Sequence, residues 1–236
     1  YINTGDTSKL VILNAALAEL NRAIGEHQTA LQFLETAENL YRLSPKDPGN
    51  LAIIQGTRAA IYFEILAIGV EKHYTALTQK QMTVTQHQFI NGKMTADFLC
   101  NVLAARKSAA TLYDPFLLIK TNNLLGKYYN GLKQYDKVLP LYMDALRIIR
   151  ESGITHEEPL VLSNLTFFYS DQGRWDEALP FGLEAYSKAQ ASGVKFYRWQ
   201  TSNSLSVIYQ AKGNFDQSLR YKKEDADLLA ALYNEK

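Results

Sequence analysis

The four histidines are the first residues to test for metal or acid–base chemistry. They are His27, His73, His87 and His156. None belongs to an HExxH motif, and none stands at a metal-ligand spacing from the single cysteine, Cys100. We therefore expect these histidines on the surface or in the packing between helices, and we expect no bound metal.

Cys100 is the one residue that could act as a thiol nucleophile. It lies in an apolar stretch, residues 98–103. An apolar setting raises the cost of forming a thiolate, which is the reactive species. This setting predicts a buried, unreactive thiol, and a single cysteine cannot form an internal disulfide.

Two further patterns could suggest catalysis. Residues 126–133 have the glycine and lysine content of a phosphate loop, but the lysine comes one residue late and no Ser or Thr follows it. The adjacent acids Glu157-Glu158 and Glu224-Asp225 would point in different directions on a helix, so we expect them to be solvated. The sequence thus predicts no catalytic residue, no cofactor and no enzyme activity in this chain.

Composition narrows the class of partner. The 236 residues carry a net charge of +1, which gives no electrostatic reason to bind nucleic acid or an anionic membrane. Hydrophobic residues make up 47% of the chain, as in a globular protein. No run of 18 apolar residues occurs, so no segment is expected to span a bilayer. Because the chain starts at Tyr1 and not at Met, we expect a piece of a longer protein.

The elements that would position any site follow an internal repeat. Tyr129, Tyr169 and Tyr209 recur every 40 residues. Three further columns keep this spacing: the leucines 125, 165 and 205, the aromatic residues 135, 175 and 215, and the aspartates 136, 176 and 216. A fixed period of this length indicates stacked supersecondary units.

Each repeat is predicted to be a pair of helices. Leu165 and Tyr169 stand at i and i+4 on one face of a first helix, which ends at Gly173. Trp175, Ala178, Leu179 and Ala185 then mark the inward face of a second helix. Gly153 and Gly193 follow the second helices, where a left-handed cap favours glycine. Pro140 and Pro180 lie just beyond the first turn of these helices and should each bend one slightly.

Earlier copies extend the array. Leu17, Gly25, Ala30-Leu31 and Ala37 match Leu165, Gly173, Ala178-Leu179 and Ala185. A second helix is predicted at 95–111, its first helix at 79–90, and a helix pair or one long helix at 51–77, after a break at 44–49. We expect an all-α fold: one right-handed α-solenoid over 1–236 with five to six hairpins. The clear repeats span 11–43, 116–153, 156–193 and 196–234, and the degenerate ones 51–112.

This pattern resembles tetratricopeptide repeats (TPR). The 40-residue period is longer than the usual 34 and is similar to the subgroup found in kinesin light chains and in bacterial peptide-sensing regulators and sensor kinases. Residues 221–229 and 232–236 further resemble the exit segment of repeat-containing bacterial histidine kinases.

The resemblance implies a binding module without catalysis, serving as the input region of a two-component sensor histidine kinase. Dimerisation through a downstream coiled coil and an extracytoplasmic location would accompany that role. The alternative is a free-standing or transcription-regulator-linked adaptor that binds peptides or proteins in the cytoplasm.

A concave groove is the one binding surface that the predicted geometry supplies. Leu125 is expected to face the partner helix of its hairpin. A side chain two residues further along lies about 200° around the helix and therefore points away from that partner. This step and its equivalents select Lys120, Asn123, Lys127, Asn130, Ser163, Phe167, Ser170, Asn203, Val207 and Gln210. Carboxamides can donate to and accept from a peptide backbone at once. The resemblance implies backbone-binding asparagines here and lysines that hold a terminal carboxylate. The alternative is a solvated helix face.

Overall fold

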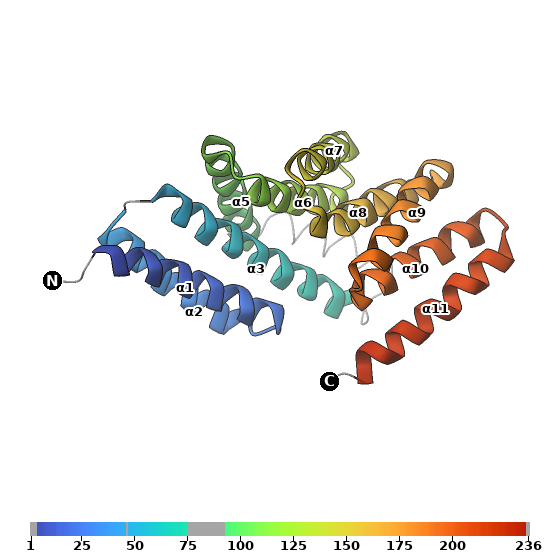
Figure 1. Ribbon diagram of the computed structural model, residues 1–236, viewed down its shortest axis with the longest axis horizontal. Coiled ribbons are helices and arrows are strands. Elements are labelled where there is room, and N and C mark those ends of the chain that lie inside the picture. The colour runs from blue at the N-terminus through green and yellow to red at the C-terminus, as the bar shows by residue number, and fades with distance from the viewer. Residues whose placement is uncertain (1–3, 46, 75–92, 235–236) are drawn as a thin grey trace. The chain divides into compact units, whose positions relative to one another are not determined.

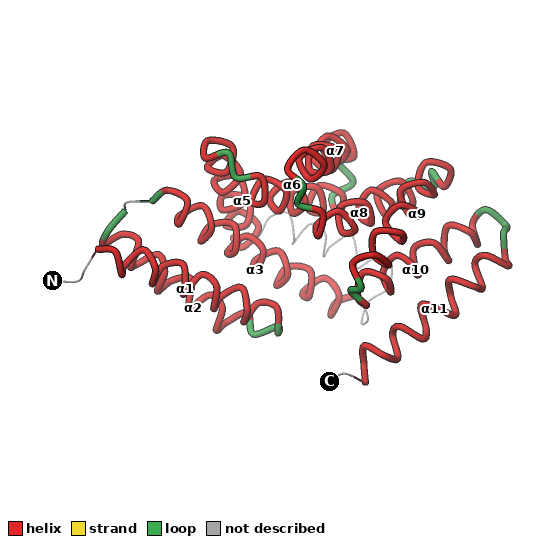
Figure 2. Tube along the Cα trace, in the orientation of Figure 1, coloured by secondary structure: helices red, strands yellow, loops and turns green. Residues whose placement is uncertain are grey.

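The structure is a computed structural model that describes residues 4–45, 47–74 and 93–234. These residues form ten α-helices and one short 3-10 turn, and no strand occurs among them (Figure 2). The helices are α1 (Thr4–Ala23), α2 (His27–Leu43), α3 (Pro48–Tyr74), α5 (Lys93–Leu112), α6 (Pro115–Gly131), α7 (Tyr135–Ser152), α8 (Glu158–Asp171), α9 (Trp175–Ser192), α10 (Lys195–Ala211) and α11 (Phe215–Asn234). The predicted all-α fold is confirmed.

The chain has two compact units, an N-terminal unit of residues 1–128 and a C-terminal unit of residues 129–236. In the N-terminal unit α1 packs against α2, α2 against α3, and α3 against α5. In the C-terminal unit α8 packs against α9, α9 against α10, and α10 against α11 (Figure 1). Each unit therefore follows the consecutive helix pairing that the repeats predict. A single array over 1–236 stays a prediction.

The same turn joins the two helices of four hairpins. The backbone N–H of Arg174 donates to the carbonyl of Tyr169 at 2.9 Å, and Asn214 donates to Tyr209 at the same distance. The equivalent bonds run from Gln134 to Tyr129 at 3.0 Å and from Glu26 to Asn21 at 2.8 Å. These bonds set the register: residue n of α1 corresponds to n+148 in α8 and n+188 in α10.

The predicted ends of the second helices are confirmed. α7 and α9 end at Gly153 and Gly193, whose φ angles of 74° and 70° are left-handed. Pro140 and Pro180 lie inside these two helices, as expected. α1 begins at Thr4, seven residues ahead of the predicted start at residue 11. The sequence did not reveal these first turns, because they carry mostly polar residues and show no apolar period.

The degenerate region is described in part. α3 is a single long helix as far as Tyr74, which favours the single-helix alternative for 51–77; residues 75–77 fall outside the described residues. α5 agrees with the helix predicted at 95–111. The first helix predicted at 79–90 falls outside the described residues. Phe63 on α3 and Phe98 on α5 hold the pair together, with ring centroids 5.7 Å apart.

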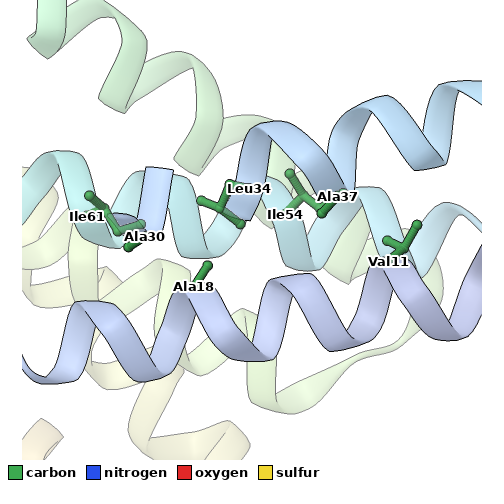
Figure 3. Close-up of a cluster of buried hydrophobic side chains, with 7 residues drawn as sticks. All are labelled: Val11, Ala18, Ala30, Leu34, Ala37, Ile54 and Ile61. Atoms are coloured by element: carbon green, nitrogen blue, oxygen red, sulfur yellow. The ribbon is translucent and has the colours of Figure 1, made fainter. Parts of the chain in front are cut away.

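Buried aliphatic residues form the core of each unit. In the N-terminal unit α1, α2 and α3 contribute to one cluster (Figure 3): Val11, Ala18, Ala30, Leu34, Ala37, Ile54 and Ile61. In the C-terminal unit the predicted inward residues Leu165 and Tyr169 are buried, as are Ala178 and Ala185. Burial of these side chains is what orders the helix pairs, since isolated helices of this length are marginal in water.

Candidate binding face

Six of the predicted groove residues lie on the first helices of the two complete hairpins in the C-terminal unit. α8 carries Ser163, Phe167 and Ser170, and α10 carries Asn203, Val207 and Gln210. We call these six residues the first-helix face. Their positions correspond one to one across the 40-residue repeat, so both helices present the same columns of side chains.

The centre of the first-helix face is apolar and exposed. Phe167 is 60% exposed and Val207, its equivalent in the next repeat, is 47% exposed. The flanking residues Leu165 and Phe168 are buried, with 0% and 2% exposure. α8 thus fills its inward sides with apolar contacts and still places a phenyl ring in solvent, where a partner could cover it.

Polar atoms surround this apolar centre. Ser163 is 2% exposed, and its Oγ has no hydrogen-bond partner among the described residues. Asn203 and Ser170 are half-buried and Gln210 is exposed. A hydroxyl and two carboxamides can each donate and accept, which matches the alternating groups of a peptide backbone.

The remaining groove residues lie on α6. Asn123 is buried and Lys127 is half-buried, both in the N-terminal unit. Asn130 lies in the C-terminal unit, and its Oδ1 is buried without a hydrogen-bond partner among the described residues. The structure thus gathers six predicted residues on α8 and α10 and the other four on α6.

Lys120 already holds a carboxylate of its own chain. Its Nζ lies 3.1 Å from Oε1 of Glu19 and 4.8 Å from the ring centroid of Phe116. Burial would raise the pKa of Glu19, but the hydrogen bonds and charges of Arg22 and Lys120 outweigh burial and lower that pKa. A ligand carboxylate at Lys120 would have to compete with Glu19.

The prediction that the adjacent acids are solvated is wrong for Glu158 and Asp225, which are buried, while Glu157 and Glu224 are half-buried. Glu158 is 3% exposed and lies between Arg150 at 3.3 Å and Lys188 at 2.7 Å. Asp225 is 6% exposed, 2.9 Å from Lys222. A buried carboxylate persists only when cations compensate its lost hydration. The cations of Glu158 come from the neighbouring helices α7 and α9, so only the tertiary structure could reveal them, whereas Lys222 lies one turn before Asp225 on α11.

Glu224 is also paired, in the α10–α11 hairpin. It accepts a hydrogen bond from the Tyr186 hydroxyl at 2.6 Å and from Nη2 of Arg198 at 2.7 Å. Burial and this hydrogen bond raise the pKa of Tyr186 to about 12. These contacts tie α9, α10 and α11 together and leave Glu224 no role as a free acid.

Cys100 is exposed, so the expectation of a buried thiol is wrong. Phe98 and Val102, both 0% exposed, take the inward face of α5. Cys100 lies about 200° around the helix from Phe98 and therefore faces outward. The apolar composition of the stretch concealed this orientation.

The described residues were also compared with the requirements of a metal site and of a membrane span. No group of three or more His, Cys, Asp or Glu among them could hold a metal ion. Nε2 of His27 lies 3.1 Å from a carboxylate oxygen of Glu64, a contact that packs α3 against the start of α2. None of the described helices combines the length and the hydrophobicity needed to cross a membrane.

Residues 160–191, which cover most of α8 and α9, match the model of the tetratricopeptide repeat family. The α8–α9 hairpin thus matches this family, and the consecutive helix pairs have a TPR-like fold. The match lies on the hairpin that carries Phe167. No curated protein sequence matches the chain.

The solved structures with a similar fold include the following two. One is a Signal Transduction ATPase with Numerous Domains (STAND) protein with a tetratricopeptide repeat sensor from Pyrococcus horikoshii, similar over 97% of this chain and 32% of its own, at 17% identity and a TM-score of 0.68. The other is BtubC from P. vanneervenii, similar over 96% of this chain and 82% of its own, at 19% identity and a TM-score of 0.67. This chain thus spans about a third of the STAND protein. At these identities the likeness concerns the fold.

Proposed function

We propose that this TPR array is a non-catalytic scaffold whose first-helix face binds an extended protein or peptide segment. The observation that carries the proposal is the exposure of Phe167 and Val207 at equivalent positions of adjacent repeats. Exposed apolar side chains ringed by polar groups are typical of interaction sites, in which a few large side chains supply most of the binding energy.

The polar residues of the face fit an extended ligand. Asn203 and Gln210 can pair with backbone groups on either side of Val207, whereas Ser163 Oγ is buried beneath the face. The apolar centre would take a hydrophobic side chain of the ligand. The groove residues on α6, which are Lys120, Asn123, Lys127 and Asn130, stay separate candidates for ligand contact.

The test uses peptides selected from a random displayed library against the chain. Their affinity is then compared for the parent and the double variant Phe167→Ala/Val207→Ala. We expect at least a tenfold loss of affinity, about 1.4 kcal/mol or more, because the apolar anchor is removed. Both side chains are largely exposed, so the melting temperature should change little.

Leu183→Ala is the matched control. Leu183 is 40% exposed, but it lies on the second helix α9 and outside the first-helix face. Its replacement should leave the affinity unchanged. Equal affinity of the parent and the Phe167/Val207 variant would exclude this face as the binding site.

We further propose that the array serves as the input region of a signalling protein. The STAND protein of the same fold contains a TPR sensor, and residues 221–236 resemble the exit segment of repeat-containing histidine kinases. The alternative is a free-standing or regulator-linked adaptor. Sequencing the complete gene discriminates them: a coiled coil and a kinase core after residue 236 support the kinase, whereas a flanking helix-turn-helix domain favours the adaptor.

A further inference from the structure

The first and last described helices each leave an apolar stripe uncovered. On α11, Phe215, Leu219 and Leu229 are 70%, 71% and 38% exposed. We call this the C-stripe. On α1, Leu13, Leu20 and Ile24 are 53%, 59% and 68% exposed. We call this the N-stripe. Neither stripe belongs to the first-helix face.

The internal repeats show what covers such a stripe. In the C-terminal unit Phe168 of α8 packs edge-on against Tyr135 of α7, with ring centroids 5.9 Å apart. Tyr135 corresponds to Phe215 two repeats later, and Phe168 corresponds to Leu20 in α1. The two residues that meet inside the array thus have exposed counterparts on α11 and α1.

The contact between α9 and α10 gives the same correspondence. Leu205 and Ile208 of α10 approach Gly182 of α9, where an added Cβ would lie 3.0 and 3.6 Å from their terminal carbons. Ile208 is 0% exposed and again corresponds to Leu20. Leu219, at 71% exposure, corresponds to Leu179 of α9, which is only half-buried.

The rest of the N-stripe agrees. Leu13 corresponds to Val161 and Thr201, which are 0% and 2% exposed in α8 and α10. The N-stripe is therefore the side with which a first helix packs on the preceding hairpin. The C-stripe is the side that a second helix offers to the following hairpin.

We propose that a second copy of this chain covers these stripes, so that the N-stripe of one molecule docks on the C-stripe of the next, head to tail. The two stripes are the two halves of a contact that the fold already makes internally. A symmetric pairing of two C-stripes is disfavoured, because Lys222 lies midway between Phe215 and Leu229 and would face its own copy.

The polar pairs found between internal repeats are missing at the proposed contact, so the contact should be apolar and of low affinity. Inside the array, Tyr135 donates a hydrogen bond to Asp171 at 2.8 Å, and Lys212 pairs with Asp176. In α1 the positions of Asp171 and Lys212 are held by Ala23 and Ile24, so neither polar pair is reproduced. Lys222 also replaces Gly182 at the point of closest approach. Association should therefore depend little on salt and require high protein concentration.

Analytical ultracentrifugation of the chain tests this contact. Between about 10 and 300 µM the weight-average mass should rise above the 26.7 kDa of the monomer, because a head-to-tail contact leaves a free stripe at each end. Leu20→Glu and Leu219→Glu, each tested alone, should keep the mass at the monomer value over that range. Both leucines are largely exposed, so circular dichroism should show both variants folded.

An equimolar mixture of the two variants is the decisive sample. Leu20→Glu retains an intact C-stripe and Leu219→Glu an intact N-stripe, so the pair should form a 1:1 complex that grows no further. Leu183→Glu, which changes an exposed leucine outside both stripes, should associate like the parent. A parent that remains monomeric at 300 µM, a mixture without the complex, or a Leu219→Glu variant that still self-associates would each overturn the proposal.

Discussion

Lys133 adopts the left-handed backbone conformation that Gly173 adopts one repeat later. The φ angle is 57° at Lys133, 70° at Gly173 and 73° at Gly213. All three residues close the turn between the first and second helix of a hairpin, and the following N–H donates back to the first helix at 2.9–3.0 Å. The same hairpin turn thus forms at Lys133, although a side chain disfavours the left-handed conformation there.

This relationship predicts opposite effects of two substitutions. Lys133→Gly should stabilise the protein by up to about 1 kcal/mol, because relief of the left-handed strain exceeds the added entropy of the unfolded chain. Gly173→Ala should destabilise it by about 1 kcal/mol. No atom lies within 4 Å of a Cβ built on Gly173, so backbone strain alone acts there. Urea denaturation measures both changes, and a loss of stability in Lys133→Gly would contradict this explanation.

The second prediction separates the inward and outward sides of α8. Leu165→Ala should destabilise the protein by about 2–5 kcal/mol, because Leu165 is 0% exposed and its loss opens a cavity. Tyr169→Ala should also destabilise, since the ring stacks on Phe181 with centroids 5.6 Å apart. Phe167→Ala, on the exposed side, should change the unfolding free energy by less than about 0.5 kcal/mol. Thermal or urea unfolding measures the unfolding free energy of the three variants. An equal loss of unfolding free energy in Phe167→Ala and Leu165→Ala would refute this assignment of inward and outward sides.

The third prediction concerns alkaline pH. Burial and the hydrogen bond to Asp171 raise the pKa of Tyr135 to about 12, and burial and Glu224 raise that of Tyr186 to about 12. An unfolded tyrosine titrates near about 10. The folded state therefore retains these protons longer, and the stability they provide is complete below about pH 10 and is lost as pH rises to about 12.

Absorbance at 295 nm measures this titration directly. Replacing both residues in Tyr135→Phe/Tyr186→Phe should remove tyrosinate absorbance from the part of the curve near pH 12 and leave the part near pH 10 unchanged. The fall in unfolding free energy above pH 10 should also be shallower than in the parent. If the absorbance is instead lost near pH 10, the two hydroxyls are not held as the structure indicates.

Local sequence determined the repeat. The 40-residue period of Leu165, Tyr169 and their equivalents identified the helix pairs, because each apolar column fills the same position in successive hairpins. Gly153, Gly173 and Gly193 located the turns and helix ends, since a left-handed φ selects glycine almost independently of tertiary context. The six residues of the first-helix face were also selected from this register, because the direction of a side chain on a helix depends only on its position.

Tertiary structure decided which side chains are covered and which charges are paired. Cys100 and Glu158 were both assigned to the wrong environment, because burial depends on what the neighbouring helices present. Lys120 pairs with Glu19, about a hundred residues away in the chain, a contact that no local pattern encodes. The uncovered stripes around Leu20 and Leu219 emerged in the same way. Their apolar residues correspond to covered residues of the internal repeats, but no neighbouring described helix covers them.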